Sequence, residues 1–315
     1  MLLFIARRLL SAIPVLFVVS LMTFVIMWLV PGDVSAEIGG TDATPEQIQQ
    51  IREQLGIDRP LLERAVNWYG NLLRGDLGHS YLLNRSVVDA VLERLPVTLS
   101  LAGLSLVLAT IMGTLLGILA AVRHNSWVDQ GSMVAALIGL SIPDFWFGLV
   151  LIILFGVTLG WLPTGGFVPI TEDFVGWVRC MTLPALTLAF TQMGVIARMT
   201  RSSMLDVLDQ DFVRTARAKG MRARTVIFKH ALRNALVPIV TVVGVTAGVL
   251  LSGAVVIESV FSLPGVGRLI VGSIQRRDFP VIQGGLLVTA SIFVFVNIVV
   301  DMLYGWLDPR VRDER

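Results

Sequence analysis

RMTRSSMLDVLDQDFVRTARAKGMRARTVIFKHALRNALVP, residues 198–238, is a charged segment enclosed by two apolar ones, and it decides the fold. It holds nine of the 25 Lys and Arg residues of the chain. In its first half an apolar residue recurs every three or four positions: Leu205, Leu208, Phe212 and Ala216. This spacing predicts one apolar helical face. Gly220 should end that helix, because glycine adopts a left-handed backbone at low cost.

A second helical pattern follows Gly220. Ile227, Ala231 and Ala235 share one line, and Phe228 lies beside Leu232. The sequence therefore predicts two short helices joined at Gly220. Such a pair between two membrane spans would form a compact docking surface, and we call residues 198–238 the coupling loop.

The composition indicates a membrane protein. Of 315 residues, 55% are hydrophobic and 15% are charged, and the mean hydropathy is +0.77. Soluble domains contain about 25% charged residues. Apolar runs of about 20 residues can cross a bilayer, and they predict an all-α fold with six spans: Leu9–Val30, Val97–Val122, Gly131–Gly160, Met181–Met199, Ala235–Ile257 and Val281–Trp306.

The chain divides accordingly into an anchor helix (1–30), a small helical extracytoplasmic segment (31–96), a transmembrane core (97–306) and a cytoplasmic tail (307–315). Val34-Ser-Ala36 resembles a signal-peptide cleavage site. The preceding apolar run is longer than the roughly 7–15 residues of a signal core, which favours an uncleaved anchor. Within 31–96, Thr44 and Gln47 predict a capped helix start, and further helices are expected at Pro60–Arg74 and Ser86–Leu95.

The distribution of basic residues predicts the orientation. The side with both termini, the 123–130 turn and the coupling loop carries 15 Lys and Arg, against 10 on the other side, of which six lie in the long 31–95 segment. Because basic residues favour the cytoplasmic side, both termini are expected in the cytoplasm.

Enzyme chemistry has little support. The sequence lacks a phosphate-binding Gly-x4-Gly-Lys-Ser/Thr loop, a His-Glu-x-x-His pair and a Gly-x-Ser-x-Gly elbow. One cysteine, Cys180, excludes an internal disulfide and a cysteine-cluster metal site. We expect no catalytic residue, no metal and no cofactor on this chain.

Polar residues inside spans are costly and are candidates for a solute path. Asp144 follows Pro143 in the third predicted span, with Phe145 and Trp146 beside it and Gln192 in the fourth. Alternatively, Asp144 bonds backbone groups freed by the proline or faces water, and Gln192 makes an interhelical hydrogen bond.

Arg214-Thr-Ala-Arg-Ala-Lys-Gly220 resembles the "EAA" loop in membrane subunits of bacterial ATP-binding-cassette importers, in the peptide/nickel permease branch. Arg214, Thr215 and Ala216 stand at the Glu-Ala-Ala positions and Gly220 at the glycine. Leu232-Arg233 replaces the Leu-Pro of the wider family. Further motifs extend the resemblance over the whole chain: Pro31-Gly-Asp33, Gly75-Asp-Leu-Gly78, Phe261-Ser-Leu-Pro-Gly-Val-Gly-Arg268, Arg277-Asp-Phe-Pro-Val-Ile-Gln283 and Asp308-Pro-Arg310.

The resemblance implies a type I importer transmembrane domain in the bacterial inner membrane. Its partners would be the lipid bilayer, a second and usually non-identical permease subunit, two cytoplasmic ATPases that hold ATP and Mg, and an extracytoplasmic binding protein, with no nucleic acid. Di- or oligopeptides are the expected cargo, with nickel, glutathione or another small solute as alternatives. The residues implied in ATPase coupling are Arg214, Thr215, Ala216, Arg217, Ala218, Lys219, Gly220 and Arg222.

Three other readings stay open. A self-contained secondary transporter or channel would need paired broken helices or ion-binding residues, and only Pro143-Asp144 qualifies. A membrane-embedded hydrolase would need a nucleophile–base or metal constellation. A structural assembly subunit would leave transport intact when deleted.

Overall fold

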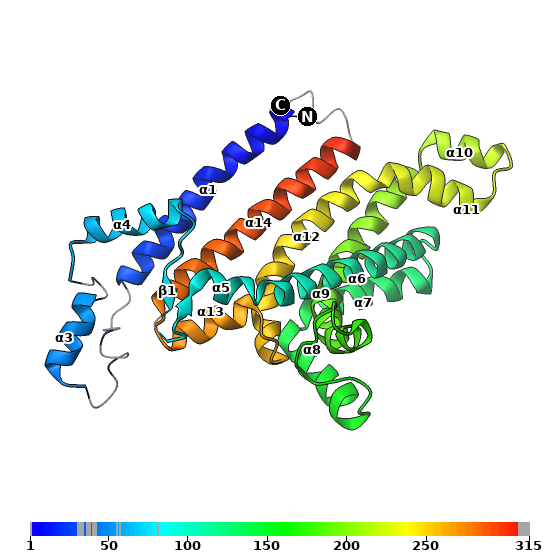
Figure 1. The fold of residues 1–315 in the computed structure, drawn as a ribbon. Helices are drawn as coiled ribbons and strands as arrows, with labels where there is room; N and C mark the ends of the chain where they lie inside the picture. Colours follow the sequence, from blue (N-terminus) through cyan, green and yellow to red (C-terminus); the bar gives the residue numbers. More distant parts are fainter. Residues whose placement is uncertain are drawn as a thin grey trace. The chain divides into compact units, whose positions relative to one another are not determined.

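The computed structural model describes residues 2–29, 35, 39, 43–54, 56, 58–80 and 82–307 (Figure 1). Of the possible cleavage site at 34–36 only residue 35 is described, and of the predicted tail at 307–315 only residue 307 is described. The elements run in the order α1 (Leu2–Leu29), α3 (Pro45–Gln54), α4 (Leu61–Leu73), β1 (His79–Ser80), β2 (Arg85–Ser86), α5 (Val87–Leu92), α6 (Leu95–Val122), α7 (Trp127–Ser141), α8 (Asp144–Leu151), η1 (Ile152–Thr158), α9 (Phe174–Leu208), α10 (Asp211–Ala218), α11 (Ala223–Thr225), η2 (Val226–Ala231), α12 (Leu232–Val260), α13 (Val266–Gln275) and α14 (Phe279–Leu307).

Five of the described helices are long and apolar enough to span a membrane, and the pair α7 and α8–η1 makes a sixth span if it is counted as one. The third predicted span, Gly131–Gly160, corresponds to this pair, which is bent by 103°. Ile142 is extended, with φ −88° and ψ 126°. Pro143 explains the break, since a residue that precedes proline is sterically driven out of the helical region.

The chain forms two compact units. The first comprises residues 99–263 with 1–6 and 295–315. In it, α9 packs against α7, α8 and α12. Glycines permit the close approach: a Cβ on Gly117 of α6 would lie 2.5 Å from the carbonyl oxygen of Ala197, and one on Gly194 would lie 2.6 Å from that of Ala136. Small residues at these positions are typical of packed membrane helices.

The second unit comprises residues 7–98 and 264–294. Its core joins α5, α13 and the start of α14 through the buried residues Val87, Ala90, Val91, Val266, Leu269, Ile270 and Val281. The hydroxyl of Ser80 donates to the buried Asp278 carboxylate. Burial raises the pKa of that carboxyl, against the opposing effect of the Ser80 hydrogen bond.

The helices expected in this unit are confirmed. The backbone N–H of Gln47 donates to Thr44 Oγ1 (3.3 Å), and that of Thr44 donates to Gln47 Oε1 (2.9 Å), which makes a reciprocal capping box. α4 lies inside the predicted Pro60–Arg74 range, and α5 lies inside Ser86–Leu95. The boundaries drawn at 30, 96 and 306 stay predictions.

Candidate functional site

The coupling loop contains a break, at residues 209–210, that the sequence pattern did not predict. α9 ends at Leu208, and α10 starts at Asp211. The single apolar face expected through Leu205, Leu208, Phe212 and Ala216 is therefore wrong. Phe212 is exposed, whereas Val213 is fully buried and Ala216 nearly so.

α10 is held on a small apolar core of the first unit. Val213 and Ala216 belong to a cluster with Met204 and Val207 of α9 and with Val226, Ala231 and Ala235 beyond the loop. Ala216 therefore packs inward, and Ala218 is the small residue that remains exposed on α10. Because the inner face is fixed, the outer face of α10 is presented at a defined position.

Gly220 ends α10 as expected. Its φ is +75°, in the left-handed region. The N–H of Gly220 donates to the carbonyl of Arg217 (2.9 Å), and the N–H of Met221 donates to that of Ala216 (3.3 Å). This pair of bonds is a Schellman motif with glycine at C′. It reverses the chain and leads it back towards the membrane span.

The second half of the loop is not a separate short helix. After α11 it winds as a π-helical turn, η2, and continues directly into α12. A π-turn contains more residues per turn than an α-helix. The buried face of this segment therefore differs from the predicted one through Ile227, Ala231 and Ala235. Val226 replaces Ile227 as the fully buried residue.

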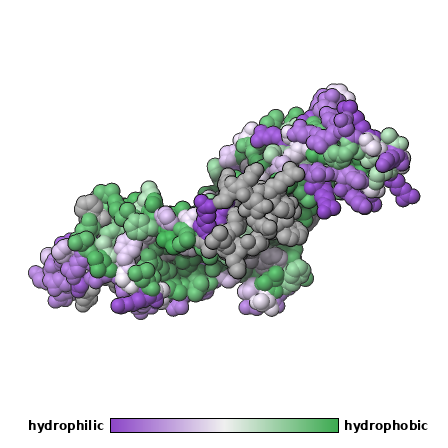
Figure 2. Space-filling model, turned by 90° about the horizontal axis from the view of Figure 1, so that it is seen from above, coloured by the Kyte–Doolittle hydropathy of each residue, from purple (hydrophilic) through white to green (hydrophobic). Residues whose placement is uncertain are grey.

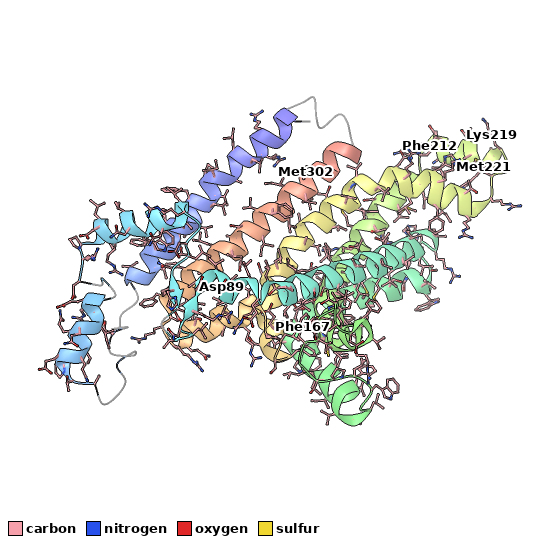
Figure 3. The ribbon with its side chains drawn as sticks, viewed as in Figure 1. Asp89, Phe167, Phe212, Lys219, Met221 and Met302 are labelled. Carbon is pink, nitrogen blue, oxygen red and sulfur yellow. The ribbon has the colours of Figure 1, made fainter. Side chains whose placement is uncertain are left out.

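The outer surface of the loop is basic. Arg214, Arg217, Lys219 and Arg222 are exposed, as are Thr215 and Ala218. Figure 2 shows hydrophilic surface gathered over the α10–α11 end of the first unit, and Figure 3 places Phe212, Lys219 and Met221 there. Arg214 lies 3.7 Å from Asp211, but both side chains are well exposed, so this pair contributes little stability.

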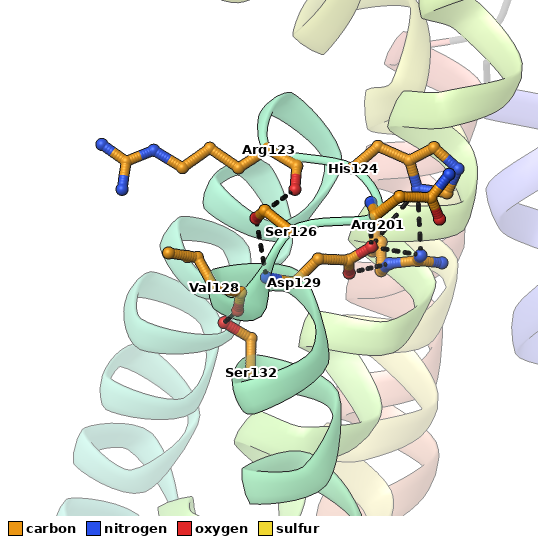
Figure 4. A network of polar contacts seen from close by, with 8 residues as sticks. Arg123, His124, Ser126, Val128, Asp129, Ser132 and Arg201 are labelled. Carbon is orange, nitrogen blue, oxygen red and sulfur yellow. Dashed lines mark hydrogen bonds and ion pairs between the residues drawn. The ribbon is translucent and has the colours of Figure 1, made fainter.

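A partly buried ion pair lies near the same end of the unit (Figure 4). Arg201 of α9 donates from Nε to Asp129 Oδ1 (2.5 Å) and from Nη2 to Asp129 Oδ2 (2.7 Å). His124 Nδ1 lies 3.3 Å from the same carboxylate, which is 3% exposed. This network joins the start of α7 to α9, ten residues before α10. The sequence pattern missed it because its partners are 72 positions apart.

The predicted solute-path residues come partly together. Asp144 is in the first turn of α8, and its carboxylate accepts a hydrogen bond from Thr191 of α9. Phe145 and Trp146 are exposed, and Gln192 is half-buried on α9 beside Thr191. Thus α9 holds both halves of the bent α7–α8 pair, through Arg201 and through Thr191.

A cavity of about 470 Å³ lies behind α10. Its lining residues include His124, Leu208, Asp209, Arg217 and Val226. Within the described residues, no group of three or more His, Cys, Asp or Glu side chains could hold a metal ion.

The family described as binding-protein-dependent transport system inner membrane component matches residues 113–313, and its N-terminal family matches residues 1–102. The chain belongs to this family. The permease is thus a multi-pass inner membrane component of a transport system.

Curated relatives cover almost the whole permease. It is 48% identical, over 98% of both chains, to a putative peptide transport system permease protein of Brucella abortus. It is 43% identical over the full length of both chains to the di/tripeptide transport system permease DppB of Pseudomonas aeruginosa. It is also 43% identical, over 99% of both chains, to the glutathione transport system permease GsiC of Escherichia coli.

Solved structures show the same fold. An inward-facing structure of the MetNI methionine ABC transporter matches with a TM-score of 0.56 and 18% identity, over 67% of this chain and 93% of that chain. The permease therefore has the transmembrane fold of a type I ABC importer.

Proposed function

We propose that the permease forms half of the translocation path of an ATP-driven peptide importer, and that α10 docks into an ATPase subunit. The basic outer face of α10, fixed from behind by buried Val213 and Ala216, is the observation that carries the proposal. The peptide cargo is supported by the names of the relatives from Brucella abortus and Pseudomonas aeruginosa.

In this assembly a second permease subunit completes the path, two ATPases hold ATP and Mg, and a binding protein delivers the solute. Arg214, Arg217, Lys219 and Arg222 make ionic contacts to the ATPase, and Ala218 permits close approach. Closure of the ATPases on ATP moves α10, and α9 and α12 carry that motion to the bent α7–α8 pair. The path then alternates between two discrete packings.

The docking face is tested by charge reversal. Replacing Arg214, Arg217, Lys219 and Arg222 together by Glu should abolish co-purification of the ATPases and solute-stimulated ATP hydrolysis, because the ionic contacts become repulsive. The matched control replaces four exposed basic residues elsewhere, Arg59, Arg74, Arg123 and Arg276, and should keep both. Retained ATPase binding in the α10 variant would refute the docking role.

Glutathione is the second candidate cargo, because GsiC is as similar to this chain as DppB is. Uptake into proteoliposomes that contain the full assembly with its binding protein distinguishes the two candidate cargoes. Radiolabelled dipeptides and tripeptides should accumulate with ATP, and glutathione should compete weakly. Accumulation of glutathione with no competition by peptides would make glutathione the cargo and refute the peptide assignment.

A further inference from the structure

Helix α4 has three distinct faces. One side contacts α1: the hydroxyls of Tyr69 and Ser20 lie 3.2 Å apart, and the Tyr69 and Phe17 rings are stacked at 6.1 Å. Trp68 packs on Phe24, with ring centroids 5.7 Å apart. α4 therefore lies against the body of α1, as Figure 1 shows, rather than beyond its end.

These contacts place α4 at membrane depth. The span of α1 begins at Arg7 and runs to Ile26. At 1.5 Å per residue, Phe17 lies about 14 Å and Phe24 about 24 Å along the helix from Arg8. The hydrocarbon core of a bilayer is about 30 Å thick. The α4 contacts thus extend from about the bilayer midplane, at Phe17, into the leaflet opposite Arg7 and Arg8, at Phe24.

A second face of α4 is apolar and is not covered by the part of the chain that the structure describes. Leu62, Val66 and Leu73 are 77%, 64% and 88% exposed. At 100° per residue they fall within about 40° of arc, next to the side that contacts α1. The third face carries Glu63, Asn67, Asn71 and Arg74, all exposed.

We infer that α4 is an interfacial helix whose Leu62–Val66–Leu73 stripe is immersed in the acyl chains of that leaflet. The stripe continues the exposed apolar surface of α1, which includes Phe17 and Leu21 and belongs to a helix long and apolar enough to span a membrane. The polar face is turned to the headgroups. A clean division of this kind is typical of helices that lie in the membrane plane.

This inference goes beyond the proposed function and is independent of the cargo. A membrane-embedded α4 restrains the otherwise polar segment between α1 and α5 at the bilayer surface. A protein partner on the same stripe, such as the binding protein or the second permease subunit, is the competing occupant.

The test uses single cysteines in the complete, reconstituted assembly. The chain has one native cysteine, so Cys180→Ser gives a clean background. Cysteines at Leu62, Val66 and Leu73 are labelled with an environment-sensitive nitrobenzoxadiazole probe. The matched controls are cysteines at Asn67 and Asn71 on the polar face of the same helix. Only variants that retain ATP hydrolysis are compared, so misfolding is excluded.

We expect blue-shifted emission at Leu62, Val66 and Leu73, quenching by doxyl-labelled phosphatidylcholine and loss of quenching by iodide, with the reverse pattern at Asn67 and Asn71. Iodide quenching at the stripe would place it in water and overturn the inference. Protection from both quenchers, or protection that appears only with the binding protein, would assign the stripe to a protein partner and overturn it as well. The experiment measures the environment of α4 and not solute uptake. A negative result would therefore refute the membrane position of α4 without bearing on the peptide assignment.

Discussion

Gly220 is the residue on which the shape of the coupling loop depends. Its φ of +75° is unfavourable for residues with a Cβ, yet a Cβ placed there would meet no atom within 4 Å. The choice of residue at position 220 is therefore restricted by the backbone conformation and not by neighbouring atoms. Substitutions at this position test the geometry of the turn without disturbing its neighbours.

Gly220→Val should reduce solute-stimulated ATP hydrolysis, because the left-handed conformation costs an ordinary residue about 1–2 kcal/mol. Gly220→Asn should retain most of it, since Asn tolerates this region. The measurement is ATPase activity of the reconstituted assembly with and without loaded binding protein. Equal activity in the two variants would show that the turn is not required for coupling.

Asp129 and Arg201 allow a second residue-scale prediction. Arg201→Met should lower the stability of the permease by about 1–3 kcal/mol, because it leaves a buried carboxylate without its charged donor. Arg201→Met combined with Asp129→Asn should recover part of this loss. Thermal unfolding in detergent measures both, with His124→Ala as the milder control. Strictly additive losses in the double variant would contradict a direct interaction.

At the scale of elements, the sequence predicted those helix starts, helix ends and membrane spans that depend on residues close together in the chain. Thr44 and Gln47 marked the start of α3 through a four-residue motif, and Gly220 marked the end of α10. The long apolar runs predicted α1, α6, α9, α12 and α14 because lipid requires a continuous helix.

The failures have a common physical cause. The break at Asp209, the π-turn at η2 and the inward position of Val213 depend on how α10 packs against Met204 and Val226. The Asp129–Arg201 pair likewise needs α7 and α9 side by side. Such tertiary contacts leave no periodic trace in one sequence. Pro143, in contrast, carried a local signal for the bend within the third span.

Helix packing supplies the element-scale prediction. Gly117→Leu should destabilise the permease by about 1–3 kcal/mol through overpacking, because its side chain would meet the Ala197 carbonyl and Thr200 of α9. Gly103→Leu, on the same helix, should be nearly neutral, since nothing lies within 4 Å. Melting temperatures in detergent compare the two. Equal losses would show that α6 and α9 are not in close contact.

At the scale of the whole molecule, the orientation is the feature that organises the assembly. The sequence predicts that both termini are cytoplasmic; in that orientation α10 would face the proposed ATPases, and residues 31–96 would lie on the other side of the membrane. The asymmetry of Lys and Arg near the span ends supports this arrangement.

A cysteine replacing exposed Lys219 should react with a membrane-impermeant maleimide only in inside-out vesicles, whereas one replacing exposed Arg59 should react in intact spheroplasts. Both variants carry Cys180→Ser. Gel-shift labelling of the two preparations decides the orientation. Labelling of position 219 in intact spheroplasts would invert the topology and remove the docking proposal.

α12 begins where η2 ends and continues without interruption for 29 residues to Val260. At 1.5 Å per residue it is a rigid rod about 43 Å long, so a tilt of about 10° at one end displaces the other by about 7 Å. Phe261, at the far end, is fully buried and lies where a Cβ on Gly148 of α8 would be 3.1 Å from its ring. If the arginine-rich end swings as proposed, Phe261 at the far end of α12 would press against α8.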